Sequence, residues 1–323
     1  MREQVKKIYK TLSPKAVLAG TFLASLTLFL LVDLFPALFY RVIESASYLM
    51  AHNIVEFFSV MASLSIFGVG WFTFSQSKNR HALFLSCAFL AIGLLDFMHT
   101  ISYPGMPAVI TPNSVLKSTQ FWIAARFITA LAFLLSGLVR PGATNRLLLK
   151  AVLITFAIGL PAVVFVGVIF YPDRLPSTFI EGSGLTPFKI YSEYLIVLLF
   201  ALSIPAYWKR YAETGKRQIL YYMTAFVICI FSELAFTLYR SAFDTYNLLG
   251  HIYKTVAFYL IYEGVFISAV QLPYREAIEK TNQAQQECAE RKKAEAALQV
   301  SEARYRSLVE DQLELINRFR PDG

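Results

Sequence analysis

The stretch AVLITFAIGLPAVVFVGVIF, residues 151–170, has no charged side chain and decides the fold class. A helix of about 20 residues crosses a hydrocarbon core of about 30 Å, so an apolar run of this length predicts a membrane-spanning helix. The chain of 323 residues is 56% hydrophobic and only 16% charged. Soluble domains carry about 25% charged residues. The sequence therefore predicts an all-α integral membrane protein.

Seven more apolar runs lie on either side of this stretch and bring the predicted number of spans to eight. The predicted spans cover residues 16–32, 47–74, 81–101, 116–139, 147–170, 188–207, 218–239 and 248–270. No small-residue cleavage site follows the first run, so we expect an uncleaved first helix and not a signal peptide.

Basic residues are unevenly divided between the two alternating sets of connections. Fourteen Lys and Arg lie in the set that includes the N-terminal segment, and five lie in the other. Basic residues favour the cytoplasmic side, so both termini are predicted to be cytoplasmic. This imbalance also accounts for most of the formal charge of +8, and no nucleic-acid partner is expected.

The three cysteines, Cys87, Cys229 and Cys288, form no Cys-x-x-Cys pair. The first two fall inside apolar runs and are expected to be buried thiols, which behave as small hydrophobic groups. A disulfide framework is not predicted.

The composition changes abruptly after the eighth run. Residues 272–310 are rich in Glu, Lys, Arg, Gln and Ala, which predicts a long helix that leaves the membrane. Its apolar seam breaks phase near Arg291, so a dimeric coiled coil and a single solvated helix are equally supported. The last stretch, LELINRFRPDG (residues 313–323), alternates apolar and polar residues and predicts a β-strand that enters a turn. Since one strand cannot fold alone, we expect it to open a second, cytoplasmic domain.

Several ionisable residues fall inside the apolar runs. Alternating helix direction places ten polar or aromatic residues at one depth, about 5–15 Å from the outer boundary. They are His52, Glu56, Asp96, His99, Trp122, Arg126, Glu193, Glu233, His251 and Lys254. Charged groups in hydrocarbon are costly, so such a layer predicts a ligand-binding site. The inner halves are expected to be apolar except at Glu263, and His81 is expected to be solvated at the cytoplasmic interface.

The residue types leave three interpretations of this layer open. Imidazoles from His52, His99 and His251 could hold a metal ion or a haem, with the carboxylates orienting them. An organic, quinone-like ligand is the second interpretation. The third is a structural network in which Arg126 and Lys254 pair with the acids. The connections at residues 103–114 and 171–187 could cap the layer. No motif for catalysis is present.

Six segments resemble, in order, the third class of the membrane-associated sensor domains of the MASE group. They are HNIVEFFSV (52–60), GLLDFMHTISYPGMP (93–107), QFWIAARF (120–127), LTPFKIYSEY (185–194), SELAFTLY (232–239) and GHIYKTVAFYLIY (250–262), followed by Pro273 and Tyr274. Residues 289–323 resemble the linker and opening of a PAS domain. The resemblance implies a sensor domain at residues 1–274, a signalling linker helix at 275–303 and the start of a PAS domain at 304–323.

The resemblance also implies a place in the cell and an output. Members of this family precede PAS modules, histidine kinases or diguanylate cyclases in the bacterial inner membrane, and linker helices of this kind usually pair into homodimers. We therefore expect a non-enzymatic sensor module that binds a small ligand or cofactor. A membrane transporter and a structural anchor that dimerises an output domain remain as alternatives.

Overall fold

The computed structural model describes residues 12–139 and 146–318. Among these residues, eight helices are long and apolar enough to cross a membrane. They are α2 (Pro14–Leu34), α4 (Ser45–Ser77), α5 (Arg80–Ile101), α6 (Val115–Leu138), α7 (Arg146–Phe170), α8 (Pro187–Thr214), α9 (Ile219–Phe236) and α10 (Thr245–Phe266). Each coincides with a predicted span, so the predicted all-α membrane fold is confirmed.

Short elements connect these helices. They are α3 (Pro36–Phe39), the 3-10 helix η1 (Pro172–Arg174), the strands β1 (Phe179–Ile180) and β2 (Gly184–Leu185), and the π-helical turn η2 (Ile267–Gln271) that follows α10. The two strands form an antiparallel hairpin in which Phe179 pairs with Leu185.

Side-chain caps and left-handed residues set the helix ends. Ser114 accepts a hydrogen bond from the Lys117 backbone N–H and begins α6. Thr186 caps α8 in the same way, and Gly215 ends it with a φ of 63°. The helix α8 extends seven residues beyond the predicted span. These residues, 208–214, include Lys209, Arg210 and Glu213, and were therefore not predicted to lie in the membrane.

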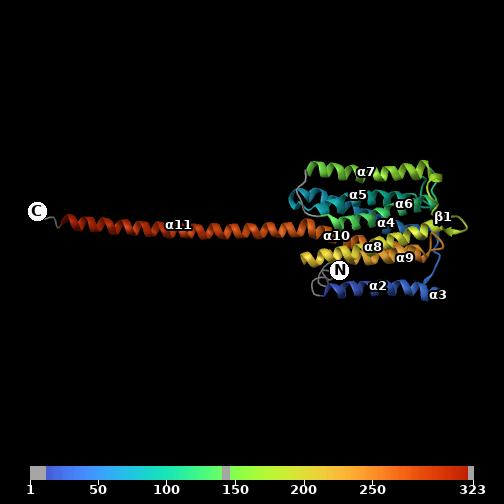
Figure 1. Ribbon diagram of the computed structural model, residues 1–323, viewed down its shortest axis with the longest axis horizontal. Coiled ribbons are helices and arrows are strands. Elements are labelled where there is room, and N and C mark those ends of the chain that lie inside the picture. Colours follow the sequence, from blue (N-terminus) through green and yellow to red (C-terminus); the bar gives the residue numbers. More distant parts are fainter. Residues whose placement is uncertain (1–11, 140–145, 319–323) are drawn as a thin grey trace. The chain divides into compact units, whose positions relative to one another are not determined.

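Six of the eight spans form a closed ring. Around the ring, α4 contacts α5, α5 contacts α6, α6 contacts α8, α8 contacts α9, α9 contacts α10, and α10 returns to α4. The other two spans lie outside it: α7 packs against α5 and α6, and α2 packs against α9 (Figure 1). Side chains that point into the ring are therefore enclosed by protein, whereas α2 and α7 leave most of their apolar surface for lipid.

Small residues allow α4 and α5 to approach closely. A Cβ on Gly70 would lie 1.8 Å from Ser86 Oγ and 2.9 Å from the Ala82 carbonyl. Ser86 Oγ donates a hydrogen bond of 2.8 Å to the Ile66 carbonyl across this contact. Such close contact between small residues is how helices associate in lipid, where no hydrophobic force drives them together.

A cluster of phenylalanines fills the middle of the ring. Phe89, Phe133, Phe226 and Phe258 come from α5, α6, α9 and α10, and all are fully buried. Their ring centroids lie 4.8 to 5.9 Å apart in three successive contacts, in edge-to-face geometry. We call these four residues the phenylalanine plug.

The helix α11 (Leu272–Arg318) lies in a second unit of the chain, residues 272–323. Its side chains are exposed from Tyr274 to residue 312, and Arg291 pairs with Glu295 at 3.1 Å. The predicted long helix is confirmed. The predicted strand is wrong over residues 313–318, which are helical. A strand needs a partner for its backbone groups, whereas a helix pairs them internally. Residues 319–323 lie outside the described residues.

Candidate functional site

The ten predicted site residues all converge at one end of the ring. Each is at most 2% exposed, although the residues come from positions 52 to 254 of the chain. Every helix of the ring contributes, and α2 and α7 contribute none. His52 and Glu56 lie on α4, Asp96 and His99 on α5, Trp122 and Arg126 on α6, Glu193 on α8, Glu233 on α9, and His251 and Lys254 on α10. This end is where α5 and α9 finish and the other four ring helices begin.

Three imidazole rings form the first level of the site. The ring centroid of His52 lies 4.6 Å from that of His251 and 5.5 Å from that of His99, and the last two are 5.7 Å apart. Trp122 closes one side, at 5.1 Å from His99 and 5.0 Å from His251. We call His52, His99 and His251 the histidine trio.

Hydrogen bonds orient two members of the trio. The Nδ1 of His99 lies 2.9 Å from the backbone carbonyl of Ser118. The Ser118 hydroxyl also lies 2.9 Å from Nδ1, but it donates to the His99 carbonyl at 3.1 Å. Since the Ser118 carbonyl only accepts, this arrangement favours a hydrogen on Nδ1 and a lone pair on Nε2. The Nδ1 of His251 lies 2.7 Å from Glu56 Oε1, which fixes this ring in the same way.

The trio retains nitrogen atoms that bond to nothing else. Neither ring nitrogen of His52 has a hydrogen-bond partner among the described residues, and the same holds for Nε2 of His99. Buried polar atoms without partners are uncommon, because each costs about 1–3 kcal/mol. These nitrogens are therefore available as ligands.

The second level, one helical turn deeper, is a chain of ion pairs. Lys254 Nζ lies 2.6 Å from Glu56 Oε2 and 3.0 Å from Asp96 Oδ2. Arg126 Nη2 then lies 3.2 Å from both oxygens of Asp96. These pairs link α4, α5, α6 and α10, so this half of the layer satisfies its own charges and ties the ring together.

A second ionic group lies on the α8–α9 side. Lys189 pairs with Glu193, which also accepts from Trp122 Nε1 at 3.3 Å. Glu233 has Glu193 and Arg126 as electrostatic neighbours, but neither of its oxygens has a hydrogen-bond partner in the described ranges. Lys189 is a residue of the site that the sequence did not predict. Its spacing of four residues from Glu193 was the available signal.

The layer has a formal charge of −1 when every acid is ionised. It contains the carboxylates Glu56, Asp96, Glu193 and Glu233 and the cations Arg126, Lys189 and Lys254.

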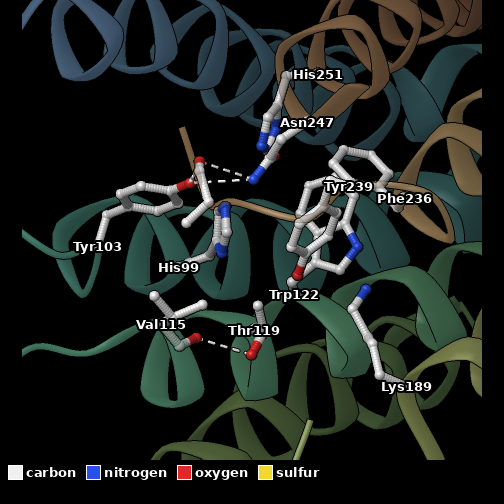
Figure 2. Close-up of a pocket in the computed structure, with 11 residues that line it drawn as sticks. His99, Tyr103, Val115, Thr119, Trp122, Lys189, Phe236, Tyr239, Asn247 and His251 are labelled. Atoms are coloured by element: carbon white, nitrogen blue, oxygen red, sulfur yellow. Dashed lines mark hydrogen bonds between the residues drawn. The ribbon is translucent and has the colours of Figure 1, made fainter. Parts of the chain in front are cut away.

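A small cavity adjoins the trio. Its volume is about 10 Å³, and His99, His251, Trp122 and Lys189 are among the residues that line it. Figure 2 shows it enclosed by aromatic side chains, with Asn247 hydrogen-bonded to Tyr103 at 3.2 Å. Organic ligands occupy pockets of about 300–1,000 Å³, so neither a haem nor a quinone-like molecule fits here. The cavity has room only for an ion or a water-sized group, and neither His52 nor Glu56 is among its lining residues.

The donor set matches a metal ion in number and type. One ligand atom from each of His52, His99, His251 and Glu56 lies within 4.8 Å of all the others. In a tetrahedral site with metal–nitrogen distances of about 2.0–2.1 Å, ligand atoms are about 3.3 Å apart. The donor atoms can thus lie farther apart than in an occupied tetrahedral site, and Glu56 is already engaged by His251 and Lys254.

The two connections named as possible caps contact the ends of the ring. Lys117 Nζ donates to the carbonyls of Val109 and Thr111, at 2.9 and 3.0 Å, and holds the first connection against α6. Thr178 of the second connection bonds Thr119 of α6 at 2.5 Å between their hydroxyl oxygens. Thr119 also lines the cavity, so the second connection reaches the site.

The expectation for His81 is wrong. The residue is 7% exposed, and its Nε2 lies 2.9 Å from the hydroxyl of Tyr207, which also bonds Ser136 at 2.5 Å. The inner half of the ring therefore holds a polar cluster besides Glu263, which is 2% exposed. The predicted burial of Cys87 and Cys229 is confirmed.

A ring of membrane-spanning helices with a buried polar layer at one end defines a multi-pass membrane protein with an internal site. The family of membrane-associated sensor domains called MASE3 matches residues 43–273, and the chain belongs to this family. No curated protein and no solved structure matches the chain. The chain thus contains a membrane-associated sensor domain, and α2 precedes the matched region.

Proposed function

We propose that this chain is a sensor input module in which the histidine trio binds a first-row transition metal ion, zinc or copper. The observation that carries the proposal is the convergence of three buried imidazoles, of which His52 has no hydrogen-bond partner at either ring nitrogen and His99 has none at Nε2 among the described residues. Imidazole suits zinc and copper, and a carboxylate behind a ligating histidine, as Glu56 is behind His251, orients the ring.

Transmission would run through α10. His251 and Lys254 lie on this helix, which continues into the π-helical turn Ile267–Gln271. π-Helical turns often occur at functional sites because they contain an extra residue that can shift register. A bound ion would draw the three rings together and favour one arrangement of α4, α5 and α10. Signalling requires the ion to bind two arrangements with different affinity.

The proposal extends to the cellular setting. Residues 1–274 would form the sensor domain in the bacterial inner membrane, with both termini cytoplasmic. Residues 275–303 would pair in a homodimer as a signalling linker, and residues 304–323 would open a PAS domain ahead of a histidine kinase or a diguanylate cyclase. The basic residues near the predicted cytoplasmic ends of the spans support this orientation.

Metal analysis of the purified protein tests the proposal. We expect about one zinc or copper per chain, and loss of the metal in a variant with His52, His99 and His251 all changed to Ala. The matched control is His81→Gln, which alters the remaining histidine and should retain the metal. A metal content near zero in the parent chain, or an equal content in the triple variant, would overturn the proposal.

Output measurements on the full signalling protein distinguish a sensor from a structural anchor and from a transporter. His251→Ala should make output insensitive to added metal while the protein still reaches the membrane. A structural anchor would give the same output with and without the trio. A transporter would move metal into sealed vesicles, which the phenylalanine plug in the ring argues against.

A further inference from the structure

A second cavity, separate from the histidine trio, lies on the outer side of α6. Its volume is about 360 Å³, within the usual range for small-molecule sites. It lies between α6, α7 and the connection before α8, and is lined by Gln120, Ile123, Ala124, Val163, Val164, Gly167, Val168, Leu175, Pro176, Thr178 and Phe188. We call it the α6–α7 cavity.

One polar side chain in this cavity lacks partners. Gln120 is 7% exposed, and neither its amide oxygen nor its amide nitrogen has a hydrogen-bond partner among the described residues. The only other polar side chain in the lining, Thr178, already bonds Thr119. Each unsatisfied end of a buried amide is costly, so a ligand that offers an acceptor to Gln120 Nε2 or a donor to its oxygen would be stabilised here.

The cavity opens toward the bilayer. Its wall α7 lies outside the ring, and Val163 at its border is 70% exposed. Val163 and Gly167 precede the end of α7 at Phe170 by seven and three residues, or about 10 and 5 Å along the helix axis. A molecule that enters from lipid would therefore place its polar end near the membrane surface.

The lining specifies the chemistry of the occupant. No charged side chain is among the lining residues, which disfavours a phospholipid headgroup or a carboxylate. A Gln amide donates to a carbonyl and accepts from a hydroxyl. We propose that the α6–α7 cavity binds the head group of a membrane-soluble quinone, whose ring carbonyl accepts a hydrogen bond from Gln120 Nε2 while its chain extends past Val163 into lipid.

The two sites share one helix wall. Thr119, next to Gln120, lines the cavity beside His99, and its hydroxyl bonds Thr178 of the α6–α7 cavity. A quinone in the outer cavity would contact the connection that also reaches the histidine trio. The sensor would then read a second ligand through α6, independently of the metal.

Titration with decylubiquinone tests this inference on the whole chain in detergent micelles, with empty micelles subtracted. We expect saturable binding that weakens about tenfold in Gln120→Leu, since one hydrogen bond is lost while the apolar lining is kept. Gln76→Leu, at an exposed position on α4, is the matched control and should bind as the parent does. Gly167→Leu, which fills the cavity, should abolish binding.

Two outcomes overturn the inference. Equal affinity in the parent chain and in Gln120→Leu would mean that the amide takes no part. Equal binding of decane and decylubiquinone would identify an acyl-chain crevice without a head-group site. Metal content should be unchanged in Gln120→Leu and Gly167→Leu, so failure here is distinguishable from failure of the metal proposal.

Discussion

Changing Asp96 to Asn should destabilise the sensor domain strongly. Asp96 accepts from Arg126 through two contacts of 3.2 Å and from Lys254 at 3.0 Å, and all three side chains are fully buried. Asparagine keeps the shape but removes the negative charge. Lys254 retains Glu56, so the loss falls mainly on Arg126. Removing one partner of a buried ion pair costs about 3–5 kcal/mol, because the remaining charge is uncompensated.

The assay is reversible unfolding of the purified protein in mixed micelles, followed by circular dichroism. Asp173→Asn, on the exposed turn η1, is the matched control and should stay within about 0.5 kcal/mol of the parent. In a double-mutant cycle, Arg126→Gln should cost much less in the Asp96→Asn background than in the parent. A cost below about 1 kcal/mol for Asp96→Asn, or strict additivity in the cycle, would refute the reasoning.

Three other predictions address packing, the inner polar cluster and topology. Gly250→Ala should cost about 1–3 kcal/mol in the same assay, because its Cβ would lie 2.4 Å from the Phe236 ring, whereas Gly20→Ala has nothing within 4 Å and should be neutral. Tyr207→Phe should lower the unfolding free energy by about 1–3 kcal/mol, because His81 and Ser136 both lose their hydrogen bond to the hydroxyl. An unchanged unfolding free energy would mean that these hydrogen bonds do not stabilise the inner polar cluster. Cys288 is exposed and the other two thiols are buried, so a membrane-impermeant maleimide should label Cys288 alone, and only in inside-out vesicles if the predicted orientation holds.

Helix periodicity and alternating direction predicted ten residues that lie together in the site, but not Lys189. The pairs His52–Glu56 and Asp96–His99 have helical spacings of four and three, so each pair had to face one side of its helix. Counting from the ends of apolar runs then placed residues from six helices at one depth. This worked because lipid permits few alternatives to straight helices of fixed length.

The sequence did not predict how the helices are arranged, because contacts between helices determine that arrangement. The closed ring of six with two spans outside depends on packing such as Gly70 against Ser86, and hydropathy does not encode it. His81 and Lys189 lie near the ends of apolar runs, where a residue can face either solvent or the interior of the ring. Both proved buried because a partner on the protein side, Tyr207 or Glu193, satisfies them.

The phenylalanine plug has a bioenergetic consequence. A cell that maintains a membrane potential stores about 2.3 kcal/mol per elementary charge for every 100 mV, and any wetted path across the bilayer would dissipate it. The polar layer on one side and the His81 cluster on the other would form most of such a path if they were joined. Four interlocked aromatic rings interrupt it. The domain can therefore hold ionisable groups deep in the membrane while remaining an insulator.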